Sequence, residues 1–383
     1  MKNLRKMDKT LLVLIIIYCL FGLIMIFSAS SASTVLKYGT ASTHFFVRQL
    51  IALIAGFFVG FLILLIPTKY QKMTTYILTA GVTILLFVVL VKGTITNNAQ
   101  SWFNIGPFKV QPSEFAKTMI ILYMAFFYST LQRNKMPFIM YFIPAILAAV
   151  MTLLIAKQPD WGSAIILILI SFFCFLEVPF IKKNKKTISK IILIGAAILA
   201  VFGSLFINEI LTDEKKSRIT QFSNPCERYQ DDTGYQVCNG FIAIANGGLF
   251  GVGLGQSSQK YLYLPESHTD FIFPIICEEC GAIVGSLIIL GYGFILLRIL
   301  KIAKKADNVR NRIIAYGTFW YFCLHILINL LGILALIPLT GVPLPFLTYG
   351  GSYTLNALIL LFFTERVAIE NKTNQINRQI ASI

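Results

Sequence analysis

The chain has 383 residues, of which 56% are hydrophobic and only 13% are charged, and its mean hydropathy is +0.74. Soluble globular domains carry about 25% charged residues, so this composition excludes a disordered chain, a collagen, a coiled coil and a disulfide-dense secreted scaffold. The net charge is +16, but the cations lie between apolar runs rather than in one basic patch, which excludes a nucleic-acid partner. The composition predicts an integral membrane protein.

Ten apolar runs are long enough to cross the hydrocarbon core of a bilayer, which takes about 20 mostly apolar residues. The first run follows four basic residues, as a signal peptide would, but it is longer than the core of about 7–15 residues that is typical of a signal peptide. We therefore expect an uncleaved signal anchor, and one all-α membrane domain over residues 1–383. In chain order, the ten predicted transmembrane helices are 11–27, 45–66, 74–91, 113–131, 138–156, 161–181, 188–210, 271–300, 313–336 and 354–369.

Lysine and arginine are enriched in cytoplasmic loops, and this bias orients the spans. If the N-terminus is cytoplasmic and the spans alternate, 22 of the 33 Lys and Arg residues fall inside and 11 fall outside. This division predicts that both termini are cytoplasmic. It also predicts that the longest connection, residues 211–269 between the seventh and eighth spans, is a large extracellular loop, and that the inner side has an affinity for anionic lipid.

Four segments on the predicted outer face are rich in Gly, Pro and charged residues, namely 100–117, 157–163, 246–279 and 338–352. Ionisable groups at membrane depth are costly and usually functional. The last two segments are too broken by Gly and Pro to form helices, yet too apolar to lie in water. Non-helical backbone at that depth is tolerated where it lines a protein cavity, so the four segments predict one shared outer cavity.

Five sequence motifs in these segments closely resemble the signature segments of one known family. They read WFNIGPFKVQPSEFAK, KQPDWGSA, GGLFGVGLGQS, LPESHTDFIF and PLTGVPLPFLTYGGS. The chain resembles the RodA/FtsW/SpoVE family, also called SEDS, over essentially its whole length and in the right order. Within that family, the SAS after the first span and LPESHTDFIF are more similar to FtsW than to RodA.

The resemblance implies an enzyme that polymerises peptidoglycan from lipid II on the outer face of the bacterial plasma membrane, at the division septum for an FtsW-like member. It also implies a class B penicillin-binding protein as partner, together with other divisome proteins. The residues encode no metal cluster, although a divalent cation (Mg or Mn) could accompany the diphosphate of the substrate. A lipid II flippase, an elongation-type (RodA-like) polymerase and a non-enzymatic scaffold are the alternatives.

Asp270 is the predicted catalytic residue, at the point where the long loop enters the eighth span. Joining a sugar hydroxyl to an anomeric carbon requires removal of the hydroxyl proton, which is the task of a general base. The resemblance carries the family's essential aspartate over to this position. The alternative is an ordinary interfacial acid or a helix N-cap.

Several other polar residues are candidates for binding the lipid diphosphate or the sugar. Glu114 and Lys117 are three residues apart on one helix face, and Lys117 could stabilise the pyrophosphate leaving group; a structural ion pair is the alternative. Arg218 and Lys157 are further cations that could meet the diphosphate, or be solvated loop charges. The same substrate-binding role is expected of Trp102, Gln111 and Glu266.

The remaining candidates were expected to line the cavity or to stabilise the outer loop. Asp160 precedes an apolar run and also has the signature of an N-cap, and one of Glu278 and Glu279 could hold a cation or an arginine. Cys226 and Cys238 both fall in the outer loop, where a disulfide can form, and free thiols are the alternative. Cavity-lining positions are also predicted at Gly350, Gly351 and Ser352.

Two further patterns carry no predicted chemistry. Ser267, His268 and Asp270 have the residue types of a hydrolase triad, but near neighbours in sequence do not readily converge in space. His325 and Asn329 share a face of the ninth span, where polar side chains hydrogen-bond neighbouring helices. We expect both to have that structural role.

Overall fold

The protein is predominantly helical in the computed structural model, which describes residues 6–179 and 224–382 apart from 97, 98, 107, 231, 262 and 266, together with 186, 189, 190 and 195. Its helices are α1 (Lys9–Tyr38), α2 (His44–Leu65), α3 (Thr68–Lys92), α4 (Pro112–Arg133), α5 (Ile143–Ala156), α6 (Trp161–Leu176), α10 (Asp232–Gly247), α11 (Ile272–Lys304), α12 (Val309–Ile333) and α13 (Gly351–Ala381), with short 3-10 turns η2 (Phe138–Phe142) and η3 (Pro225–Arg228). Three strands, β1 (Thr94–Thr96), β2 (Ala99–Ile105) and β3 (Phe108–Val110), complete the described elements.

Seven of the described helices are long and apolar enough to cross a membrane, which makes this a multi-pass membrane protein. They are α1, α2, α3, the helical segment Ile139–Ala156, α11, α12 and α13, and α6 is apolar but shorter. The expected span 188–210 lies outside the described residues, apart from a few positions.

The helix α4 is present where a span was expected, but it is not among those seven helices. It packs against α3, α6, α12 and α13, and most of its residues are buried. Because this helix faces other helices rather than lipid, it can carry the charged pair Glu114 and Lys117 near its beginning. The helix that carries this buried pair is therefore covered by four other helices.

A small antiparallel sheet corrects the expectation of an all-α chain. The strands pair in the order β1-β2-β3, with Trp102 opposite Thr94 and Phe103 opposite Val110. The tight turn between β2 and β3 contains Gly106 at φ +58°, a conformation that glycine adopts without steric cost. The sheet leads the chain directly into Pro112 at the first turn of α4.

A kink in α11 joins this helix to the glycine-rich segment 247–255 of the preceding loop. Gly281 has φ +84°, and a Cβ there would lie 2.2 Å from a backbone oxygen of the segment 249–251. The backbone groups that the kink releases from α11 are bonded by the loop, which satisfies them inside the protein. The bonds run from Val252 N to Glu278 O (2.9 Å), from Gly253 N to Glu279 O (3.0 Å) and from Ala282 N to Gly248 O (2.9 Å).

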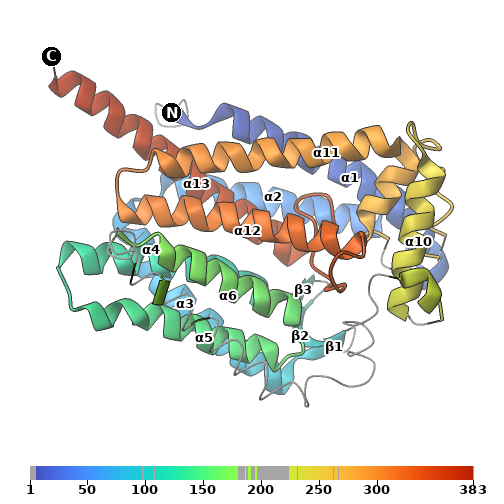
Figure 1. Ribbon diagram of the computed structural model, residues 1–383, viewed down its shortest axis with the longest axis horizontal. Helices are drawn as coiled ribbons and strands as arrows, with labels where there is room; N and C mark the ends of the chain where they lie inside the picture. Colours follow the sequence, from blue (N-terminus) through green and yellow to red (C-terminus); the bar gives the residue numbers. More distant parts are fainter. Residues whose placement is uncertain are drawn as a thin grey trace.

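The described part of the long connection 211–269 contains its own helix. α10 packs against α11 and lies across one end of the molecule, whereas the start of α1 and the end of α13 lie towards the other end (Figure 1). A disulfide joins Cys226 to Cys238 and so attaches η3 to α10. The bridged alternative is therefore the one that the structure contains.

The segment 338–350 is irregular, as its Gly and Pro content predicted, and other elements bond its backbone. Such bonds are needed wherever non-helical backbone lies at membrane depth. They run from Asn329 Nδ2 to Val342 O (2.8 Å), from the Tyr292 hydroxyl to Pro345 O, from Gln49 Nε2 to Thr348 O (3.4 Å) and from Tyr349 N to His268 O (2.9 Å).

Candidate active site

Asp270 lies just before α11 and is held in place through its backbone. Its carbonyl oxygen accepts a hydrogen bond from Asn329 Nδ2 (3.0 Å), and the same amide donates its other hydrogen to Val342 O (2.8 Å). Asn329 was expected to bond a neighbouring helix, but it bonds two irregular segments instead. One side chain of α12 thereby fixes the position of Asp270 relative to segment 338–350.

The Asp270 carboxylate faces the turn at Gly341. A Cβ on Gly341 would lie 3.3 Å from Asp270 Oδ2, and Gly341 has φ +68°, so both space and backbone conformation favour glycine here. On the other side of this turn, a Cβ on Gly162 would lie 2.9 Å from Thr340 O. The beginning of α6, the 338–350 segment and the entry to α11 therefore meet around Asp270.

Asp160 caps α6 and binds the start of α4. Its Oδ1 accepts from Ser163 N (3.1 Å), and its Oδ2 accepts from Gln111 Nε2 (2.8 Å) and from the Ser113 hydroxyl (3.1 Å). The N-cap interpretation is therefore confirmed. The same carboxylate thus connects two of the predicted outer segments, 100–117 and 157–163, by hydrogen bonds.

A buried polar group lies on α4 below this cap. Lys117 is 1% exposed and Glu114 is 3% exposed, and their charged atoms are 2.8 Å apart. The Lys117 ammonium also lies 3.2 Å from His325 Nε2, while His325 Nδ1 lies 2.7 Å from Tyr321 O. Because a carbonyl oxygen only accepts, Nδ1 carries the ring proton and Nε2 accepts from Lys117.

The ion-pair interpretation of Glu114 and Lys117 is thus confirmed, and the ammonium is bonded within the protein. Glu114 Oε2 is buried and has no hydrogen-bond partner among the described residues. An unsatisfied buried carboxylate oxygen is costly, so this atom is a candidate acceptor for a substrate group.

His325 and Asn329 are four residues apart on α12, so they lie on one helix face. The first contacts Lys117 on α4, and the second holds Asp270. Sequence reasoning placed both side chains on one face but did not identify these partners. The face of α12 therefore connects the predicted base with the buried cation.

Glu278 and Glu279 bind residues of the loop that precedes α11. Both are buried. Glu279 Oε1 pairs with Lys260 (2.9 Å) and accepts from the Ser28 hydroxyl (2.8 Å), so one of the two acids does hold a cation, as expected. Glu278 accepts from the Ser258 hydroxyl (2.9 Å). Sequence reasoning missed Lys260, whose signal is a single cation between the two loop motifs GGLFGVGLGQS and LPESHTDFIF.

The other predicted residues are placed as follows. Gly350 N donates to Gln49 Oε1 (3.1 Å), Gly351 opens α13, and the Ser352 hydroxyl accepts from Gln111 N (3.2 Å). Trp102, on β2, is half-buried, and Lys157, in the turn before Asp160, is exposed. Arg218 and Glu266 lie outside the described residues.

No group of three or more His, Cys, Asp or Glu side chains that could bind a metal ion is found in the described part of the chain. The polar groups that do converge are a carboxylate on a fixed backbone, a capped helix start and a buried cation. The Asp270 carboxylate can accept a proton, and the Lys117 ammonium, although paired with Glu114, is the cation of this group.

Comparison with known proteins relates this chain to cell-wall proteins. A model of the FtsW/RodA/SpoVE family, described as "Cell cycle protein", matches residues 8–373. A relative from Bacillus subtilis (strain 168), named "Probable peptidoglycan glycosyltransferase FtsW", is 38% identical over 94% of this chain and 89% of its own length.

Solved structures share the fold. A chain of the structure described as "Structural coordination of polymerization and crosslinking by a peptidoglycan synthase complex" has a TM-score of 0.74 and 22% identity, over 95% of this chain and 98% of that one. The Rod shape determining protein RodA of Thermus thermophilus has a TM-score of 0.66 and 24% identity, over 94% and 96% of the two chains.

Proposed function

This chain belongs to the FtsW/RodA/SpoVE family, and from that premise we propose that it is a peptidoglycan glycosyltransferase that joins lipid II into glycan strands. The relative from Bacillus subtilis that carries the name FtsW covers nearly the whole chain at 38% identity. That similarity favours the FtsW-type polymerase of septal wall synthesis over the elongation-type polymerase and the flippase.

The observation that supports the catalytic proposal is the fixed position of Asp270. A general base must lie within hydrogen-bond reach of the proton that it removes, so its position must be fixed. Asn329 holds the backbone of Asp270 against segment 338–350, and the carboxylate lies over the turn at Gly341. This is where the predicted outer segments meet.

In the proposed reaction, Asp270 accepts the proton of the acceptor sugar hydroxyl of lipid II. The hydroxyl oxygen forms a bond to the anomeric carbon of the donor glycan from the face opposite the diphosphate. The bond between that carbon and the diphosphate oxygen breaks, and undecaprenyl pyrophosphate leaves with the electron pair. One such displacement inverts the anomeric centre.

The negative charge that grows on the diphosphate is stabilised by nearby cations. We assign this role to Lys117, whose buried ammonium acts through a medium of low dielectric constant, and to Lys157 and Arg218. Glu114 Oε2, Trp102, Gln111 and Glu266 are assigned to substrate binding. A divalent cation bound to the diphosphate would neutralise further charge.

The proposal includes ten spans, cytoplasmic termini and an outward-facing Asp270, supported by the unequal division of Lys and Arg along the chain. It also includes a class B penicillin-binding protein as partner, together with other division proteins. Support for a partner is the similarity in fold to a chain of a complex described as coordinating polymerization and crosslinking.

The test is purified wild-type protein with labelled lipid II, with and without a class B penicillin-binding protein. We expect glycan strands that are longer than the substrate and are cut by a muramidase. The opposite result is that labelled lipid II crosses the bilayer of a proteoliposome and that no strands form, with or without the penicillin-binding protein. The protein would then be a flippase.

A further inference from the structure

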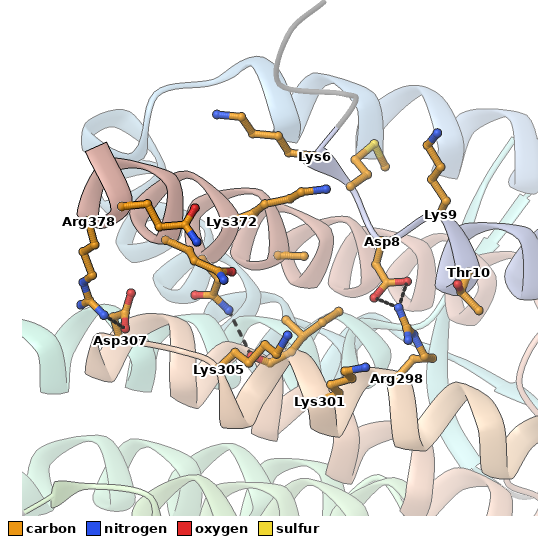
Figure 2. A pocket seen from close by; sticks show the side chains of 16 residues that line it. Lys6, Asp8, Lys9, Thr10, Arg298, Lys301, Lys305, Asp307, Lys372 and Arg378 are labelled. Carbon is orange, nitrogen blue, oxygen red and sulfur yellow. Dashed lines mark hydrogen bonds and ion pairs between the residues drawn. The ribbon is translucent and has the colours of Figure 1, made fainter. Parts of the chain in front are cut away.

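A cavity of about 880 Å³ lies between the start of α1, the last turns of α11 and the second half of α13. Figure 2 shows it at close range, and Figure 1 shows these three parts towards the end of the molecule away from α10. Asp270 precedes α11, a helix of 33 residues, which spans roughly 50 Å at 1.5 Å per residue. The cavity is therefore separate from the candidate active site.

The lining of this cavity is strongly basic, with seven Lys and Arg residues and two carboxylates. Both carboxylates are already paired, Asp8 with Arg298 (2.6 Å) and Asp307 with Arg378 (3.2 Å). The other five cations form no ion pair with any described residue, and they surround a space that can hold a ligand. They are Lys6, Lys9, Lys301, Lys305 and Lys372.

A lipid-facing stripe of α11 leads into the cavity. Leu290, Phe294 and Leu297 are each 61% exposed, and their spacing of four and three residues places them on one helix face. Lys301 continues the same face one turn later and lines the cavity. Large apolar side chains that are exposed on a membrane helix contact the acyl chains of lipids. This face of α11 therefore contacts acyl chains up to Leu297, and from Lys301 on it can contact lipid head groups.

The neighbouring helix α1 repeats the pattern. Val13, Ile17 and Leu20 are exposed and follow Lys9 at four, eight and eleven residues, on one face. α1 packs closely on α11, since a Cβ on Gly291 would lie 2.3 Å from the Tyr18 hydroxyl. Two adjacent helices therefore each place a cavity lysine at the end of an exposed apolar stripe.

We propose that this cavity binds the phosphate of an anionic phospholipid, whose acyl chains lie along the exposed stripes of α1 and α11. Lysine recognises phosphate as a point charge, and basic pockets between membrane helices bind anionic head groups. A zwitterionic head group supplies its own ammonium and gains less from the five lysines. The proposed orientation places this lipid in the inner leaflet, and the inference does not depend on the proposed activity.

The test measures the binding of phosphatidylglycerol and of phosphatidylcholine to the full chain in detergent by native mass spectrometry. The cavity variant combines Lys9→Gln, Lys301→Gln and Lys305→Gln. The matched control combines Lys69→Gln, Lys72→Gln and Lys304→Gln, which removes the same charge from positions that do not line the cavity. Elution volume and thermal unfolding verify that both variants are folded.

We expect the Kd for phosphatidylglycerol to rise by roughly tenfold or more in the cavity variant, because each lysine near an anionic surface contributes about fivefold. The control variant should change it by less than about twofold. Equal losses in both variants, or equal binding of the two lipids by the wild type, would overturn the proposal. Displacement of the lipid by glycerol 3-phosphate at equal concentration would also overturn it, because the site would then take a soluble phosphate.

Discussion

The side chain of Asn329 has two N–H groups, and two backbone carbonyls accept them, one from Asp270 and one from Val342. Neither carbonyl lies in regular secondary structure at this point. A buried carbonyl that loses its donor costs about 1–3 kcal/mol. At the residue scale, the site therefore depends on an amide that does not itself touch the reacting atoms.

Asn329→Ala should lower the turnover number for lipid II polymerisation by roughly 10–100-fold, because small misplacements of a catalytic group are costly. The KM should change much less. The matched control is Asn356→Ala, which removes a buried amide that donates to Ser352 O (2.8 Å) within its own helix. If both variants lose the same activity, Asn329 has no special role in positioning Asp270.

His268, two residues before Asp270, should make the stability of the protein depend on pH. Burial, with the charge of Lys37, lowers the pKa of His268 from 6.5 to about 4. As the pH falls, the unfolded chain therefore binds the proton first, so this contribution to stability is full above pH 6.5 and is lost progressively towards pH 4. Between pH 7.5 and 5.5 the loss is about 1 kcal/mol.

Thermal unfolding at pH 7.5 and pH 5.5 measures this effect. The drop in melting temperature on acidification should be smaller in His268→Gln than in the wild type. Comparing the drop within each protein removes any difference in their baseline stability. An equal drop in both proteins would contradict the assignment.

The kink in α11 shows how one element is shaped by another. Gly281 has a non-helical conformation, so nearby backbone groups of α11 lack their helical hydrogen bonds. The loop segment 248–253 forms hydrogen bonds with these groups instead. The buried pair of Lys260 and Glu279 lies close to the same place. At the element scale, the loop segment 248–260 and the beginning of α11 therefore form one unit.

Gly281→Ala should destabilise the protein by more than about 3 kcal/mol, because a Cβ would collide with loop backbone at a positive φ. Gly293→Ala is the matched control on the same helix, where no atom lies within 4 Å of the added Cβ. That substitution should be neutral, or stabilising by about 0.5–1 kcal/mol. The measurements are melting temperature and the yield of monodisperse protein, and similar losses in both variants would rule out this account of the kink.

The helices were predictable from the sequence, because a span needs only a continuous apolar run, and α2, α11 and α12 begin within a few residues of the expected positions. The β1-β2-β3 sheet was not predictable, since two of its strands, Thr94–Thr96 and Phe108–Val110, are too short to show an alternating pattern. The kink at Gly281 depends on a loop some 30 residues earlier. Likewise, spacing placed His325 and Asn329 on one face, but their partners come from distant segments.

At the scale of the whole molecule, the basic cavity and the entry to α11 lie towards opposite ends of the described part of the chain. α10 and the beginning of α11, which Asp270 precedes, lie towards one end, and the helix ends that line the basic cavity lie towards the other (Figure 1). Positive charge on the cytoplasmic side is the pattern that orients membrane proteins. This arrangement supports both the proposed topology and the anionic-lipid site.

Cysteine labelling in intact cells tests this orientation. A membrane-impermeant maleimide should react with Asn224→Cys, on the predicted outer loop, and should not react with Ser382→Cys until the cells are opened. Both positions are exposed. The five native free thiols are buried or half-buried, and the wild-type protein measures their background. Labelling of Ser382→Cys in intact cells would show that the C-terminus is outside the cell and would contradict the proposed topology.

The most direct test of the central claim is glycan-strand synthesis from labelled lipid II by matched amounts of purified wild-type and Asp270→Asn protein, each with its penicillin-binding partner. The substitution keeps the shape of the side chain but removes its basicity, so strand synthesis should fall by at least about 10²-fold. Membrane insertion, melting temperature and partner binding should be unchanged, because Asn329 holds the backbone of residue 270 and not its carboxylate. Strands from Asp270→Asn at near the wild-type rate would contradict the assignment of Asp270 as the general base.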